Sequence, residues 1–166
     1  MQEVVLAGLT EFGENRVQGA LLKYQSFREV IWHMVGHLQT NKVKEAVRIF
    51  SLIHSVDSER LAETIDKEAL SAGKVQDILV QVNTSGEASK YGIDTDKAAE
   101  FIKKISVNKN IRIRGFMTIA PESDDPEASR PYFRVLRELR DGFDQRLILS
   151  MGMTGDFEIA IEEGAT

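Results

Sequence analysis

Three histidines are the first groups in this 166-residue sequence that could do chemistry. His33, His37 and His54 fall at or near two predicted strands. If the strand that begins at Ile31 continued through residue 37, His33 and His37 would face one side, and His54 on the next strand could join them as the metal site of a hydrolase. Gly36 interrupts that alternation, and no Asp or Glu stands beside them at ligand spacing. Hydrogen-bonded histidines that fix loops are the simpler interpretation.

A turn rich in glycine and hydroxyl groups is the second candidate. It reads Ser150-Met151-Gly152-Met153-Thr154-Gly155-Asp156, after an apolar strand pattern and before a helical one. Glycines and hydroxyls at such a place expose backbone amides that can hold an anion such as phosphate. Thr154 can equally serve only as the N-cap of the following helix. Spacing alone leaves both interpretations open.

Asn15 and Met117 stand at two other strand ends. Asn15 can donate to a ligand, or it can cap the helix that begins at Arg16. Met117 can line a ligand cavity, or it can simply complete the core. Lys42 and Lys90 are the lysines nearest strand ends. A lysine that bonds to a carbonyl compound needs a pKa lowered by burial or by a neighbouring cation, so exposed lysine is the simpler interpretation of both.

The elements that must position these groups alternate between strand and helix. Strand patterns lie at residues 11–14, 31–35, 52–56, 75–82, 111–119 and 147–151, and a helical pattern follows each of them. The connections are short enough for parallel strands with right-handed crossovers. Either an open doubly wound sheet or a closed barrel of eight (β/α) units accommodates this order, although the chain shows six units. No glycine-rich G-x-G-x-x-G or Walker loop favours the nucleotide-binding open sheet.

Composition narrows the class of protein. The chain is 42% hydrophobic and 28% charged, which fits one domain over residues 1–166 with one sizeable core. Cysteine is absent, so disulfides and thiolate sites are excluded and the cytoplasm is the expected compartment. A formal net charge of -5 gives no general attraction to nucleic acid. No apolar run approaches the ~20 residues that cross a bilayer, so no membrane partner is expected.

Six stretches at successive strand ends resemble, in the same order, the motifs of the pyridoxal phosphate homeostasis proteins, the YggS/PROSC family. They read FGENRVQ at 12–18, WHMVGHLQTNKVK at 32–44, LIHSVDS at 52–58, QVNTSGEASKYG at 81–92, RGFMTI at 114–119 and LSMGMTGD at 149–156. The resemblance implies an α/β fold of the (β/α)8 TIM-barrel type, that of the alanine racemase N-terminal domain. It also implies pyridoxal 5′-phosphate (PLP) bound at the carboxyl ends of the strands.

The function implied by the resemblance is to bind PLP and deliver it to PLP-dependent apoenzymes, without strong catalytic turnover. The enzyme alternative is a racemase-like member of the same fold class, which would carry a second, β-rich domain. By resemblance, six residues surround the cofactor: Asn15, His37 and Met117 lie about its body, and Ser150, Thr154 and Gly155 belong to its phosphate site.

The chain departs from the family pattern at both ends. Family members begin with a strand that supplies the lysine bonded to PLP, and they end with a strand whose arginine faces the pyridine nitrogen. This sequence therefore resembles strands two to seven of the eight. We expect a monomer with two open sheet edges through which it can self-associate, and weak, reversible PLP binding. Strong covalent binding would instead point to Lys42 or Lys90.

Overall fold

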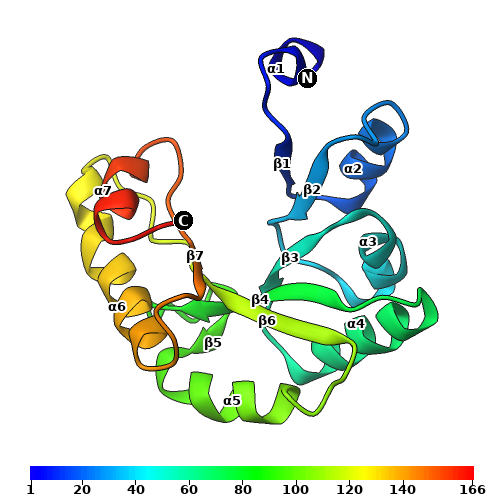
Figure 1. Ribbon diagram of the computed structural model, residues 1–166. Helices are drawn as coiled ribbons and strands as arrows, with labels where there is room; N and C mark the ends of the chain where they lie inside the picture. Colours follow the sequence, from blue (N-terminus) through cyan, green and yellow to red (C-terminus); the bar gives the residue numbers. More distant parts are fainter.

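Six parallel strands lie side by side in the sheet in the same order as they occur in the chain (Figure 1). In the computed structural model, which describes residues 1–166, they are β1 (Glu11–Glu14), β2 (Ile31–Met34), β3 (Leu52–Val56), β4 (Gln76–Asn83), β6 (Ile111–Met117) and β7 (Ile148–Ser150). A short strand, β5 (Ile93–Asp94), pairs with β4 outside this series. In a doubly wound sheet the strand order reverses at a switch point. The unreversed order is that of a (β/α) barrel.

The sheet curves far enough for strands that are not neighbours to touch across its inner face. His54 on β3 and Ser150 on β7 are hydrogen bonded at 2.8 Å, although β4 and β6 separate their strands in the sheet. Strands β1 and β7 are the two edges and do not pair with each other. The predicted barrel-type fold is therefore confirmed, as an incomplete ring of strands.

All the helices except the first, α1 (Gln2–Leu6), lie along the outer side of the curved sheet, and α1 stands apart beyond the start of β1 (Figure 1). The others are α2 (Val17–Tyr24), α3 (Val43–Ile49), α4 (Glu59–Ser71), α5 (Ala98–Ile105), α6 (Arg130–Asp141) and α7 (Phe157–Glu162), with 3-10 turns at η1 (Thr40–Lys42), η2 (Thr95–Lys97) and η3 (Pro126–Ser129). Ser58 caps α4 by accepting a hydrogen bond from the Leu61 amide, as its sequence position indicates. None of the helices is both long and apolar enough to span a bilayer.

The main core fills the space between the sheet and the helices. Neighbouring strands contribute register partners to it, such as Met34 with Ile53 and Phe116 with Leu149. The inner face carries a separate, smaller apolar cluster of Leu52, Leu79 and Met117. Because side chains alternate between the two faces of a strand, the inner face is left to a few apolar groups and to the polar groups of the candidate site.

Several predicted boundaries were wrong by one or two residues. The strand predicted at 111–119 ends at Met117. Thr118 instead uses its hydroxyl to donate to the Val82 carbonyl at 2.8 Å, which ties the end of β6 to the end of β4. Between the predicted strands, the segment after β4 runs into β5, and the acidic segment before α6 contains η3. Short elements of this kind carry too few periodic residues to be recognised.

Candidate functional site

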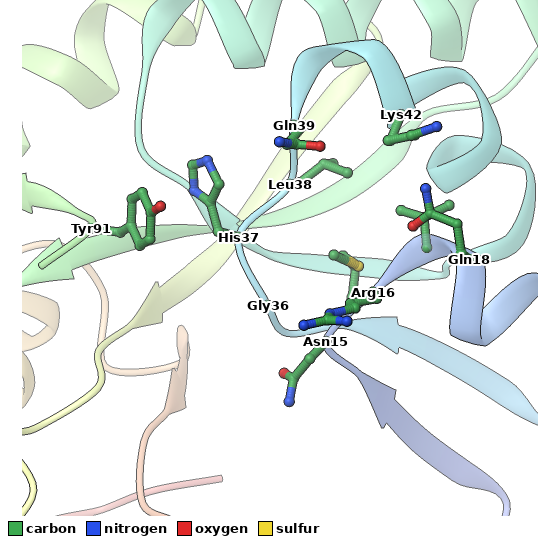
Figure 2. Close-up of a pocket in the computed structure, with 11 residues that line it drawn as sticks. Asn15, Arg16, Gln18, Gly36, His37, Leu38, Gln39, Lys42 and Tyr91 are labelled. Atoms are coloured by element: carbon green, nitrogen blue, oxygen red, sulfur yellow. The ribbon is translucent and has the colours of Figure 1, made fainter.

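Two adjoining cavities open at the carboxyl ends of the strands. The first, here called the rim cavity, has a volume of about 530 Å³ (Figure 2) and is lined by Asn15, Arg16, Val17, Gln18, Met34, Gly36, His37, Leu38, Gln39, Lys42 and Tyr91. The second, here called the inner cavity, has a volume of about 260 Å³ and is lined by Asn15, Val35, Met117, Thr118, Ile119, Ala120, Ser150, Met151, Gly152, Met153, Asp156 and Thr166. Asn15 lines both.

Asn15 is a free polar group at the end of β1. Its side chain makes no hydrogen bond within the protein, and Arg16, not Asn15, is the N-cap residue of α2. The alternative in which Asn15 caps that helix is therefore wrong. Figure 2 shows its amide pointing away from Gln39 and Lys42, at the opposite end of the rim cavity. The amide is available to a ligand in either cavity.

His37 lies on the rim, clear of the sheet interior. Its ring stacks on that of Tyr91, with ring centres 3.9 Å apart and planes 15° from parallel (Figure 2). On the other side, its Nδ1 lies 3.8 Å from a carboxylate oxygen of Asp57. Burial raises the pKa of Asp57, while His37 and backbone hydrogen bonds act in the opposite direction. His37 therefore joins the loop before β5 to the end of β3, and of the two cavities it lines the rim cavity and not the inner one.

Met117 and Ser150 are register partners on β6 and β7, and both line the inner cavity. Met117 is 2% exposed and belongs to the inner apolar cluster, so it completes a core and lines a cavity at the same time. Its partner on the other side, Gln81 of β4, is buried, and the side-chain oxygen of Gln81 has no hydrogen-bond partner. Gln81 lies next to Met117 in the sheet but lines neither cavity.

The turn after β7 presents free amides. The backbone N–H groups of Gly152, Thr154 and Gly155 donate to no group of the protein. The amide of Met153 donates to Asp156 at 2.6 Å, and Asp156 is the N-cap residue of α7. Thr154 is therefore not the helix cap. Thr154 and Gly155 follow Met153 directly and line neither cavity.

Two of the three histidines meet on the inner face. His33 Nδ1 lies 3.1 Å from His54 Nε2, and His54 Nδ1 lies 2.8 Å from Ser150 Oγ. Burial, and then the neighbouring His33, lower the pKa of His54 to about 4. Burial lowers the pKa of His33 too, although Glu11 acts to raise it.

The alternative in which the three histidines form a metal cluster is wrong. His37 lies outside the histidine pair because the chain leaves β2 at Met34, and no three acidic or histidine side chains are arranged to hold a metal ion. The link from His54 to Ser150 was missed by sequence reasoning. The two residues are 96 positions apart, and only the curvature of the sheet brings them together.

The donors around the inner cavity suit an anionic ligand of modest size. Asn15, Ser150 and the free amide of Gly152 line the cavity and can all donate to anionic oxygen atoms. No lysine lines the inner cavity. Lys42 lines the rim cavity, and the Lys90 ammonium lies 4.0 Å from Glu87.

Comparison with known proteins identifies the family. The model of a family described as alanine racemase, N-terminal domain, matches residues 1–164. A protein of Aquifex aeolicus named pyridoxal phosphate homeostasis protein is 44% identical over 173 residues, which cover 100% of this chain and 76% of that relative. The chain belongs to the pyridoxal phosphate homeostasis family, within the alanine racemase N-terminal domain group. The resemblance drawn from six sequence motifs is therefore confirmed.

Solved structures of other proteins agree with the fold. PipY of Synechococcus elongatus, in a structure without PLP, matches with a TM-score of 0.90 at 37% identity, over 99% of this chain and 81% of that one. A second PipY structure, with PLP bound, matches with a TM-score of 0.86 at 36% identity over the same shares of the two chains. An alanine racemase of Clostridium difficile matches with a TM-score of 0.73 at 12% identity, over 89% of this chain and 40% of that one, which shows the fold alone.

Proposed function

We propose that this chain binds pyridoxal 5′-phosphate at the inner cavity and serves PLP homeostasis and delivery, without strong catalytic turnover. The observation that carries the proposal is the match over 99% of the chain to PipY, a structure of which has PLP bound. The convergence of Asn15, Met117 and Ser150 on one cavity supports it. These three were among the six residues that the family resemblance assigns to the cofactor.

The chemistry of each residue indicates which part of the ligand it would contact. The free amide of Gly152 and the hydroxyl of Ser150 line the inner cavity and are donors suited to the phosphate. Thr154 and Gly155, which the family resemblance also assigns to the phosphate, lie in the same turn outside that lining. Asn15 and Met117 would contact the body of the ligand from β1 and β6. PLP supplies an aldehyde that reacts with amines, and this chain's own role is to bind and orient it. Because no lysine lines the inner cavity, binding there is reversible.

The same proposal extends to the partners, the compartment and the self-association of the chain. PLP-dependent apoenzymes would receive the cofactor, in the cytoplasm, from a single domain that comprises residues 1–166. Nucleic acid is not a partner, and this is supported by the pairing of Arg112 with Asp77 and of Arg130 with Glu127. The free edges of β1 and β7 are where two copies would associate at high concentration.

Equilibrium dialysis of the chain against PLP and against pyridoxal, which lacks the phosphate, tests the proposal. We expect saturable binding of PLP, much weaker binding of pyridoxal, and no PLP fixed to the chain after reduction with borohydride. Asn15→Ala is expected to weaken PLP binding, because it removes a free donor of the cavity. Asn108→Ala is the matched control, since Asn108 precedes β6 at the opposite ends of the strands.

Absence of saturable PLP binding would overturn the proposed function. Equal binding of PLP and pyridoxal would overturn the phosphate site in the turn after β7. If reduction did fix PLP to the chain, mass mapping of the modified lysine would show whether Lys42 of the rim cavity or Lys90 provides the bond, and the reversible mode would be wrong.

A further inference from the structure

A line of polar side chains crosses the interior of the curved sheet and ends at the inner cavity. Ser150 Oγ lies 2.8 Å from His54 Nδ1, and His54 Nε2 lies 3.1 Å from His33 Nδ1. At the far end, His33 Nε2 lies 3.8 Å from a carboxylate oxygen of Glu11. The four residues come from β7, β3, β2 and β1, and the proposed contacts with PLP use only Ser150.

Glu11, 3.8 Å from His33 Nε2, favours one of the two possible sets of proton positions in the free protein. A carboxylate accepts only, so Glu11 favours a proton on the Nε2 of His33. A neutral His33 then accepts at Nδ1, and the His54 proton lies on Nε2, from which it is donated to His33. His54 Nδ1 is left as an acceptor and takes the hydroxyl proton of Ser150. In this state, Ser150 offers only lone pairs to the inner cavity.

An anionic ligand oxygen requires the opposite arrangement. Ser150 must donate its hydroxyl proton to the ligand, so His54 has to donate to Ser150 from Nδ1. His54 Nε2 then becomes an acceptor for a proton on His33 Nδ1. If His33 keeps its Nε2 proton toward Glu11, it becomes an imidazolium and the line holds one more proton than before. That proton comes from solvent, and no bond other than N–H and O–H bonds is made or broken.

We propose that Ser150, His54 and His33 form a proton relay, through which the binding of an anionic oxygen at Ser150 takes up one proton at His33. The inference rests on the proposed function for the identity of the ligand, the phosphate ester PLP. It assigns His54 and His33 as positioning residues that set whether Ser150 donates or accepts. The relay lets Ser150 donate to a ligand that presents an acceptor, and this binding requires the uptake of one proton.

The other charged groups near the inner face are already paired. At the amino ends of the strands, Asp77 binds Arg112 at 2.6 Å and lies 3.7 Å from Arg114. Beside the inner cavity, the carboxylate of Asp156 accepts from the Met153 amide and the Ser129 hydroxyl. Glu11 is therefore the one carboxylate that faces His33. Burial lowers the pKa of both rings, to about 4 at His54, which stays neutral and passes the proton on, whereas Glu11 acts to raise the pKa of His33.

Calorimetric titration of the full chain with PLP, in buffers of different ionisation enthalpy, measures the protons taken up. Ionisation of PLP itself contributes equally to all variants. Near pH 7.5 we expect the unmodified chain to take up about one proton more than His33→Gln. As the pH rises, the PLP affinity of the unmodified chain should fall more steeply than that of the variant. The difference should be up to about tenfold per pH unit. Glu11→Gln should reduce the uptake, and Glu3→Gln on α1 is the matched control.

Equal uptake and equal pH slopes in the unmodified chain and in His33→Gln would overturn the relay. Nitrogen NMR of the imidazoles in the unmodified chain provides a test that needs no variant and no ligand. It should find the His54 proton on Nε2 at pH 8 in the free chain, and a proton on Nδ1 instead would overturn the relay. If PLP does not bind at all, the proposed function fails, and the NMR result alone decides on the relay.

Discussion

The backbone of Gly36, just after β2, lies directly against the backbone of Asn15, just after β1. A Cβ atom on Gly36 would fall 2.3 Å from the Asn15 carbonyl oxygen and 2.8 Å from its Cα. The Gly36 carbonyl in turn accepts a hydrogen bond of 2.7 Å from Ser55 on β3. Three strand ends are thereby held together, and the free amide of Asn15 is fixed at the boundary between the two cavities.

Gly36→Ala is expected to destabilise the protein by about 2–3 kcal/mol, because the added methyl group meets backbone atoms that cannot move aside. PLP affinity should fall as well, since Asn15 would be displaced. Gly142→Ala is the matched control: its nearest contact for a Cβ is 3.4 Å away, at the end of α6. Urea unfolding measures the difference. Equal stabilities of the two variants would show that the backbone at Gly36 relaxes freely.

Tyr91 is expected to hold the loop between β4 and β5 over the rim cavity. Tyr91→Ala removes the ring that stacks on His37 and should accelerate amide hydrogen exchange at residues 84–92 by several-fold, since an aromatic pair contributes about 0.5–1.5 kcal/mol. Tyr91→Phe keeps the ring and should leave the exchange rates unchanged. If Tyr91→Phe accelerated exchange as much as Tyr91→Ala, the hydroxyl and not the stacking would hold the loop.

Much of the fold could be predicted from the sequence, because it depends on local patterns. The alternation of strand and helix, the Ser58 cap of α4 and the glycine that follows the C-terminal end of α4, Gly73 with φ of +65°, all follow from short-range chemistry. Periodicity alone left open whether the sheet is flat or curved. The six family motifs favoured the curved form, and the contact of His54 with Ser150 shows it.

The candidate site was less predictable, because competing local roles could be weighed only with coordinates. Asn15 and Thr154 both stand where a helix cap is expected, but Arg16 and Asp156 occupy the cap positions. The contact between His33 and His54 could not be predicted, because it depends on where β2 ends and on the curvature of the sheet. Gln81 carried no signal in the sequence, since its buried and unpaired oxygen is a property of packing.

Glu163 is expected to stabilise the packing of α7 against α6 through its ion pairs with arginines of α6. It is 3% exposed, and its carboxylate contacts Arg130 and Arg134 at 3.2 Å and Arg137 at 2.6 Å. Glu163→Gln should cost about 1–3 kcal/mol of unfolding free energy at pH 7. Glu162→Gln, which removes an exposed partner of Arg130 alone, is the control and should cost less. A larger loss in the control would contradict the assignment.

The same contact gives a dependence on pH. Burial acts to raise the pKa of Glu163, but the hydrogen bonds and charges of the arginines outweigh it and lower the pKa below its ordinary value. A carboxylate with a lowered pKa in the folded state stabilises at pH values above its unfolded pKa, and this contribution is lost as the pH falls through the folded pKa. The stability difference between the unmodified chain and Glu163→Gln should therefore shrink in acid, as urea unfolding at pH 7 and pH 3 would show.

His54 is expected to make the protein less stable between pH 6.5 and pH 4. Its pKa is lowered from 6.5 to about 4 by burial and then by His33. Between those values the unfolded chain binds a proton that the folded chain does not, so stability falls as the pH falls through this window and is unaffected above it. The shift corresponds to about 3 kcal/mol. Stability measured by urea unfolding across this range should fall less steeply in His54→Gln, whereas His37→Gln at the rim should keep the slope. Identical slopes for His54→Gln and the unmodified chain would mean that His54 takes up its proton in the folded state and cannot remain the neutral link between Ser150 and His33.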